Sequence, residues 1–250
     1  MSEKIITEIQ RELKKNALSL APEKKSRLYK ILNSINPKFE AYGLTMPQIE
    51  RVTELAFKKY ESKYDLAVDV FKHLISSNVH EEKFAGVFYL NQVKQNFDET
   101  TIDLFREQFI QHCDTWALCD SASIRVIGPF LAKNDQLART TLETWFKSEN
   151  MWIRRAAMVI LLKIIMVKKE FDESYVFNLV EKMLVSPEEY IQKGVGWLLK
   201  TCSNYKPEVI FNYLKQHKQD FPPLVLRYAS EKLSKDQRAQ VLEKSKKAKK

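Results

Sequence analysis

Five charged residues recur along the chain at intervals of 37, 35, 38 and 34 residues; they are Lys83, Asp120, Arg155, Lys193 and Arg227, here called the charged column. A row of Lys and Arg suits a nucleic-acid phosphate backbone, because each cation displaces condensed counterions. The Arg guanidinium can also grip one phosphate through two hydrogen bonds. The column therefore predicts contacts to a polyanion at four positions and a different task at Asp120.

Three of the four tryptophans stand close to this column in the sequence. Trp116 precedes Asp120 by one helical turn, Trp197 follows Lys193 by one turn, and Trp152 lies three residues before Arg155. Indole faces attract cations, and a carboxylate attracts them more strongly. Trp116, Asp120 and Trp197 thus predict a cation-stabilising site within an anion-binding surface, although a buried core position is the usual role of any single tryptophan.

A reaction in which positive charge builds on a sugar would use such a site. Loss of a base from DNA through an oxocarbenium-like deoxyribose is one example, by analogy with glycosidases that set carboxylates beside the same kind of transition state. A purine alkylated at N3 or N7 is already cationic and leaves without a strong general acid. The sequence also lacks the GxxxxGK[ST] and GxGxxG nucleotide-binding motifs, and its four histidines show no HExxH spacing.

The elements that would position these residues are helices. Apolar residues recur at spacings of three and four, and a small or β-branched residue follows each column position by two: Ala85, Ala122, Ala157, Val195 and Ala229. Such residues let stacked helices approach closely. A period of 34 to 38 residues with two helices per unit is typical of HEAT-like repeats. We predict an all-α, HEAT-like helical-repeat solenoid of about six to seven antiparallel helix pairs, whose concave basic groove carries the column.

Charge and cysteine content set further bounds. The net charge is +9, but residues 235–250 hold seven basic and two acidic residues, so +4 belongs to the rest. We expect one repeat domain over residues 1–234 and a basic, partly disordered helix end and tail over 235–250. Column positions can also be ordinary solvated helix surface, where Lys and Arg are common. Cys113, Cys119 and Cys202 lack paired metal-ligand spacing, which predicts buried free thiols and no metal. Without a long apolar run, we expect an intracellular, cytoplasmic protein, nucleoid-associated in a prokaryote.

Four segments then resemble a known family: "YGLTMPQIERV" from Tyr42, "TWALCDSASIRVIGPFL" from Thr115, "MWIRRAA" from Met151 and "IQKGVGWLLK" from Ile191. They resemble the AlkD-like DNA alkylation repair family, HEAT-like-repeat DNA glycosylases, over roughly Arg27 to Leu233. The resemblance implies excision of N3- and N7-alkylated purines from duplex DNA, without metal or cofactor and without flipping the lesion into a deep pocket.

The resemblance also implies roles for single residues. Asp120 would stabilise the sugar cation and orient water, Trp116 and Trp197 would wall the deoxyribose, and Arg155 would hold the nearby phosphate. The residues expected to bind DNA are Lys83, Trp152, Arg154, Lys193 and Arg227. The expected partner of this monomer is double-stranded DNA with alkylated bases. Two alternatives stay open: a non-catalytic module for bent, branched or damaged DNA, and a helical scaffold for an acidic protein.

Overall fold

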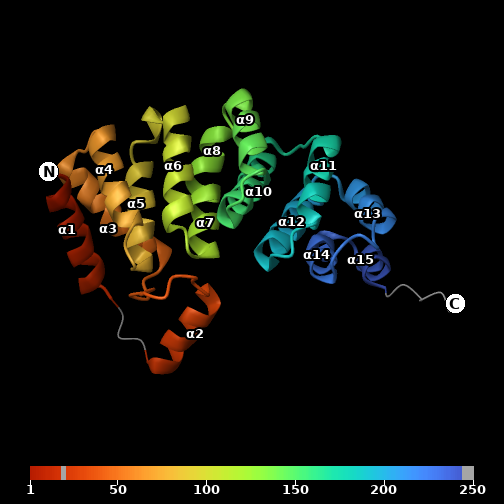
Figure 1. Cartoon of the computed structure of the whole chain (residues 1–250), viewed down its shortest axis with the longest axis horizontal. Coiled ribbons are helices and arrows are strands. Elements are labelled where there is room, and N and C mark those ends of the chain that lie inside the picture. The colour runs from red at the N-terminus through yellow and green to blue at the C-terminus, as the bar shows by residue number, and fades with distance from the viewer. Residues whose placement is uncertain (18–20, 244–250) are drawn as a thin grey trace. The chain divides into compact units, whose positions relative to one another are not determined.

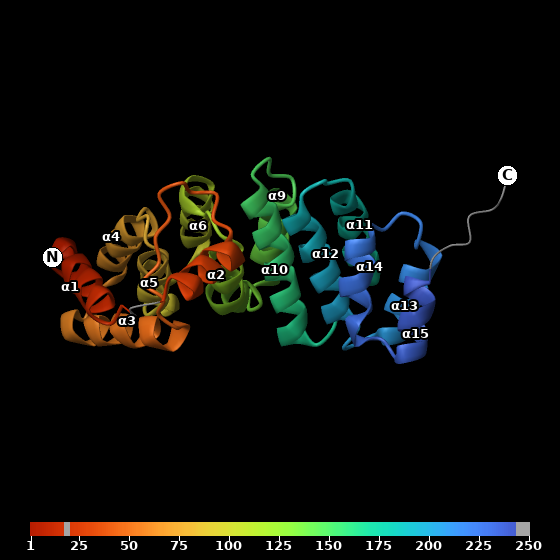
Figure 2. The same cartoon turned by 90° about the horizontal axis from the view of Figure 1, so that it is seen from below.

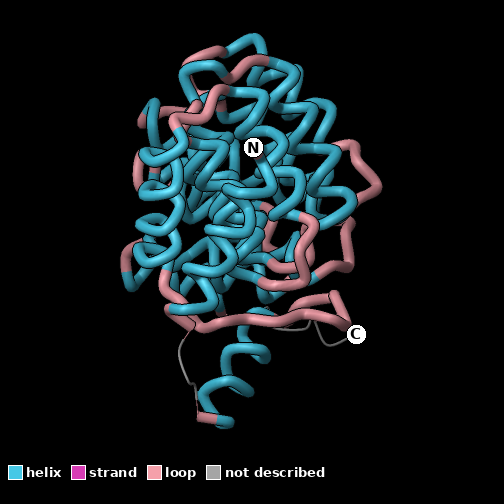
Figure 3. Tube along the Cα trace, turned by 90° about the vertical axis from the view of Figure 1, so that its left-hand side faces the viewer, coloured by secondary structure: helices cyan, strands magenta, loops and turns pink. Residues whose placement is uncertain are grey.

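The structure is a computed structural model that describes residues 1–17 and 21–243 (Figure 1). Within these residues helices and their connections form the whole fold, and a single isolated bridge between Glu40 and Val79 is the nearest approach to a strand (Figure 3). The all-α prediction is therefore confirmed. Contacts between residues divide the chain into two compact units, Met1–Phe130 (unit 1) and Leu131–Lys250 (unit 2).

Unit 1 contains seven of the longer helical elements and a short one at its end. The helices are α1 (Ser2–Lys15), α2 (Pro22–Leu32), α3 (Met46–Tyr60), α4 (Tyr64–Ile75), α5 (His80–Asn91), α6 (Glu99–His112), α7 (Trp116–Ala122) and α8 (Gly128–Leu131). Helix α1 buries Ile5, Ile9 and Leu13, at spacings of four residues, against α3, α4 and α5. Among the helices of this unit, α2 stands apart from the packed group (Figure 1).

The connection between α2 and α3 is held by an acidic side chain at the start of α5. The Glu81 carboxylate, 1% exposed, accepts hydrogen bonds from the backbone N–H groups of Tyr42, Gly43 and Leu44 at 2.7 to 3.1 Å. Gly43 has a φ of 82°, which favours glycine at this turn. The buried carboxylate thus satisfies three backbone donors that would otherwise lack partners.

Unit 2 contains the α-helices that follow α8. They are α9 (Asp135–Trp145), α10 (Met151–Lys168), α11 (Glu173–Leu184), α12 (Glu189–Cys202), α13 (Pro207–Gln216), α14 (Pro223–Ala229) and α15 (Lys235–Leu242). Helices α10, α12 and α14 pack side by side in one row (Figure 2). Helix α12 approaches α14 closely at Gly196, where an added Cβ would lie 2.5 Å from the Tyr228 Cβ. A side chain at this position would force the two helices apart.

The small residues of the repeat alignment are buried, as predicted. Each small residue of the alignment lies in one of five helices, α5, α7, α10, α12 and α14, and each has 0% exposure: Ala85, Ala122, Ala157, Val195 and Ala229. Their role in close packing therefore follows from the sequence pattern, as predicted.

The ends and the membrane question complete the fold. No helix in residues 1–17 and 21–243 combines the length and apolar character needed to cross a bilayer. The predicted basic end over residues 235–250 begins with helix α15, while residues 244–250 lie outside the described residues.

Candidate functional site

Helix α7 carries Trp116 and Asp120, two residues of the site predicted from the sequence. Thr115 is its N-cap, and the Thr115 hydroxyl accepts a hydrogen bond from the Leu118 N–H at 3.3 Å. Trp116 is half-buried, and Asp120, one helical turn later, is 6% exposed. The Trp116 indole Nε1 donates to the backbone carbonyl of Ile31 at 2.9 Å, so α2 orients this ring. Trp116 and Asp120 therefore lie one turn apart on one helix, as the spacing predicts, while their roles stay predictions.

A π-helical turn at Ser123–Ile127 follows α7 directly. The buried Ser123 hydroxyl donates to the Cys119 carbonyl at 2.7 Å. Within the turn, Arg125 pairs with Glu50 at 2.8 Å and lies over the Phe88 ring, 5.2 Å from its centroid. Such turns occur often at functional sites. A search for a 3.6-residue period does not detect this irregularity.

Lys83 differs from its prediction. Its side chain is 4% exposed, and its ammonium lies 2.9 Å from the Asp114 carboxylate and donates to the His112 carbonyl at 2.7 Å. Lys83 therefore ties α5 to the connection between α6 and α7. The predicted phosphate contact of Lys83 is corrected to a structural contact, because a buried, paired ammonium does not face a ligand.

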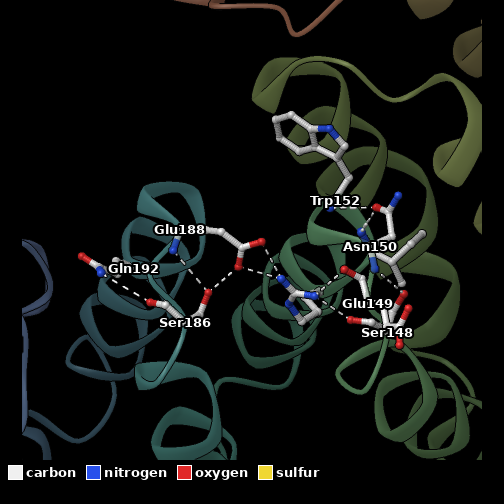
Figure 4. A network of polar contacts seen from close by, with 9 residues as sticks. Ser148, Glu149, Asn150, Trp152, Ser186, Glu188 and Gln192 are labelled. Carbon is white, nitrogen blue, oxygen red and sulfur yellow. Dashed lines mark hydrogen bonds and ion pairs between the residues drawn. The ribbon is translucent and has the colours of Figure 1, made fainter.

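Arg154 and Trp152 also differ from their predictions. The Arg154 guanidinium binds both carboxylate oxygens of Glu188, at 2.6 and 2.7 Å, and the carbonyls of Ser148 and Glu149 (Figure 4). Arg154 thus ties the start of α10 to the start of α12. Trp152 is 3% exposed, with its ring centroid 5.2 Å from that of Tyr190. Trp152 thus lies in the interior of unit 2, and the Arg154 guanidinium, with 16% of its side chain exposed, is held by Glu188 and two backbone carbonyls. Both observations argue against the assignment of these residues as DNA contacts.

The Glu188 carboxylate is the anionic partner of Arg154, and its pKa reflects this contact. Burial raises the pKa of Glu188, but hydrogen bonds from Ser186 and Arg154 outweigh it, so the pKa lies below the ordinary value. The carboxylate is thus held in its charged form as the partner of the guanidinium. Figure 4 shows the residues Ser186, Glu188 and Gln192 on one side of this network.

Arg155 lies beside this network on α10. The Asn150 side chain caps the helix by accepting from the N–H groups of Trp152 and Ile153. Arg155 is 5% exposed, its Nη1 donates to the Tyr190 carbonyl at 2.5 Å, and its Cζ lies 5.8 Å from the Tyr190 ring centroid. Its role at a phosphate stays a prediction.

The later column residues are more exposed. Lys193 pairs with Glu189 at 2.7 Å, with 32% of its side chain exposed, and Trp197 on the same helix is half-buried. Arg227 on α14 is exposed, and in the described part of the chain no carboxylate lies within ion-pair distance of it. Of the column cations, Arg227 is thus the most accessible to a phosphate.

Helix α2 is a feature that the sequence reasoning missed. Its exposed cations are Lys24, Lys25, Arg27 and Lys30, and Leu32 is its one buried residue. Ile31 and Ile35, near its end, are 52% and 66% exposed. The run "EKKSRLYK" was a usable signal of a basic helix, but nothing local indicated that its end lies against Trp116.

The three cysteines of the chain lie in its interior. Cys113, Cys119 and Cys202 are buried free thiols, as predicted, and burial raises the pKa of Cys202 to about 12. No group of three His, Cys, Asp or Glu side chains suited to a metal ion occurs in residues 1–17 and 21–243.

These features define an all-helical repeat protein with a buried carboxylate beside an oriented indole and with exposed cations elsewhere on its helices. A family model described as "DNA alkylation repair enzyme" matches residues 9–233, and the chain belongs to this family. The family assigns the protein to DNA repair, and it confirms the resemblance found in the sequence. A comparison with curated proteins gave no match.

A solved structure supports the same fold. The chain is similar to a predicted DNA alkylation repair enzyme from Enterococcus faecalis, with 20% sequence identity and a TM-score of 0.74. The match covers 86% of this chain and 96% of that one. At this identity the likeness concerns the arrangement of the helices.

Proposed function

We propose that the protein is a DNA glycosylase that excises cationic N3- and N7-alkylated purines from duplex DNA in base excision repair. The observation that carries the proposal is on α7: a carboxylate that is 6% exposed, Asp120, one turn after an indole held by a hydrogen bond, Trp116. A charge in such surroundings interacts more strongly than one in water. Membership of a DNA alkylation repair family supports DNA as the substrate.

In the proposed reaction the bond between the purine nitrogen and C1′ breaks, and its electron pair leaves with the base. The departing alkylpurine thereby becomes neutral, and the positive charge passes to the deoxyribose. The Asp120 carboxylate stabilises this oxocarbenium-like sugar and orients a water molecule that adds to C1′. The added water gives up one proton to Asp120 or to solvent. Trp116 presents its indole to the same sugar, where the ring attracts the developing cation.

DNA binding is proposed to come from the exposed cations. Lys193 and Arg227 in unit 2 would contact phosphates, as would the four cations of α2 in unit 1. The roles predicted for Arg155 and Trp197, which belong to unit 2, stay predictions. No DNA contact is proposed for Lys83 and Trp152, which are buried, or for Arg154, whose guanidinium is paired with Glu188.

The test is release of free base from duplex DNA that contains 7-methylguanine or 3-methyladenine, followed by chromatography. We expect the wild-type protein to release both bases. Asp120→Asn should slow release by about 10²-fold or more, on the scale seen when one electrostatic group is removed from an active site. Its affinity for DNA should stay close to that of the wild type.

Asp103→Asn is the matched control, because Asp103 is an exposed carboxylate on α6 of the same unit. It should release base at the wild-type rate. Release by Asp120→Asn at the wild-type rate would contradict the role of Asp120. DNA binding without any release by the wild type would instead support the non-catalytic module.

A further inference from the structure

In unit 1, Lys83 of α5 and Asp114, which lies between α6 and α7, form a buried ion pair. The two side chains are 4% and 7% exposed, and the Nζ to Oδ2 distance is 2.9 Å. Removing two charges from water is costly, so a buried pair contributes little net stability compared with apolar side chains of similar size. What the pair adds is a fixed geometry between α5 and the residues before α7.

The fixed residues lead directly into α7. Lys83 holds the His112 carbonyl at 2.7 Å as well as the Asp114 carboxylate. Asp114 is followed by Thr115, the N-cap of α7, and then by Trp116. Because a helix continues rigidly from its first turn, the position of residues 112–114 sets where Trp116 and Asp120 lie.

The same segment also holds the end of α2. The Asp114 backbone carbonyl accepts a hydrogen bond from the Ile35 N–H at 3.1 Å, and the Trp116 indole donates to the Ile31 carbonyl at 2.9 Å. The Trp116 ring is therefore fixed from two sides, through its backbone by Asp114 and through its Nε1 by α2. Loss of the ion pair would loosen both.

We infer that Lys83 and Asp114 are positioning residues that set the placement of Trp116, and through α7 of Asp120, for the reaction. This inference rests on the proposed function for its catalytic consequence, but the placement of Trp116 is testable without activity. The pair contacts neither DNA nor the reacting atoms. It acts by fixing the start of the helix that does.

The experiment separates positioning from stability with a double variant of the full chain. Lys83→Met and Asp114→Leu alone each leave a buried charge without a partner, and each should lower the denaturation midpoint. Lys83→Met/Asp114→Leu replaces the pair with apolar side chains of similar size and should recover most of that loss. Stability is measured by urea unfolding, and base release by a single-turnover rate at saturating protein.

Positioning is read directly from 5-fluorotryptophan-labelled protein by fluorine NMR. The Trp116 resonance is assigned by its loss in Trp116→Phe. In the double variant we expect this resonance to shift or broaden, that of Trp145 to stay in place, and base release to fall at least tenfold despite recovered stability. A matched control, Glu8→Leu/Lys59→Met, removes another ion pair of unit 1 (2.6 Å, between α1 and α3) and should leave Trp116 and release unchanged.

A double variant as stable as the wild type, with the wild-type Trp116 resonance and release rate, would overturn the inference. If the double variant does not fold, Asp114→Asn is the second variant, because it keeps the shape of the side chain and should give the same displacement of Trp116. If the wild type releases no alkylpurine, the proposed function fails, and the Trp116 resonance alone still decides the placement.

Discussion

Lys83 in unit 1 and Arg227 in unit 2 occupy the two ends of the charged column, yet their surroundings are opposite. The Lys83 side chain is 4% exposed and paired with Asp114, while Arg227 is exposed on the surface of α14. The difference comes from the groups that surround each side chain. Lys83 meets the Asp114 carboxylate and the His112 carbonyl at the end of α6, whereas in the described part of the chain no carboxylate lies within ion-pair distance of Arg227. A repeated residue type therefore does not imply a repeated role.

The largest expected effect is on the free energy of unfolding, and it tests the difference between Lys83 and Arg227. Lys83→Met should lower the free energy of unfolding by about 3–5 kcal/mol, because it leaves the Asp114 charge buried without its partner. Arg227→Met should change it by no more than about 0.5 kcal/mol, as is usual for exposed positions. Urea unfolding of both variants measures the two values. Equal losses would mean that the two column ends do not differ in the way described.

A somewhat smaller effect concerns His80, which lies in the same buried surroundings as Lys83. Burial lowers the pKa of His80 from 6.5 to about 4, and the charge of Asp114 opposes this only in part. The unfolded chain takes up a proton near pH 6.5, and the folded chain near pH 4. The unfolded state therefore binds more protons within this window, and the folded state loses stability as the pH falls through it.

We expect this loss to amount to about 2–3 kcal/mol between pH 6.5 and 4.5. His80→Leu should remove that part of the pH dependence, while carboxylates such as Glu8 keep theirs. Urea unfolding of both proteins at the two pH values gives the difference. Equal losses of unfolding free energy in the wild type and the variant would show that His80 is not the source of this pH dependence.

The smallest expected effect concerns Arg227 and DNA. Arg227→Ala should weaken binding to duplex DNA of any sequence and make the salt dependence shallower by about 0.9 in the slope of log K against log salt, the value for one phosphate contact. Fluorescence anisotropy at several salt concentrations measures this slope. A slope equal to that of the wild type would place Arg227 outside the DNA contact.

The sequence predicted the helical repeat well because that information is local. A 3.6-residue apolar period, together with a small residue two positions after each column member, identified helices and their packed faces, and all five small residues are fully buried. The pairing of Trp116 with Asp120 followed from the same period. These features depend on residues within one or two turns of each other.

The partners of the charged side chains could not be predicted from residues that are near in the sequence. Whether Lys83 faces solvent depends on Asp114, 31 residues later, and the orientation of Trp116 depends on Ile31, 85 residues earlier. Arg154 was predicted to bind DNA, but Glu188 lies 34 residues away in sequence and takes its guanidinium. Partners so distant in sequence meet only in the folded chain.

In the proposed reaction Asp120, and not Asp114, the other buried aspartate near α7, acts on the substrate. The most direct measurement is single-turnover release of 7-methylguanine by Asp120→Asn, with its DNA affinity and unfolding curve measured on the same preparation. We expect release slower by about 10²-fold or more, with DNA affinity close to that of the wild type. Release at the wild-type rate by a folded, DNA-binding Asp120→Asn protein would contradict it.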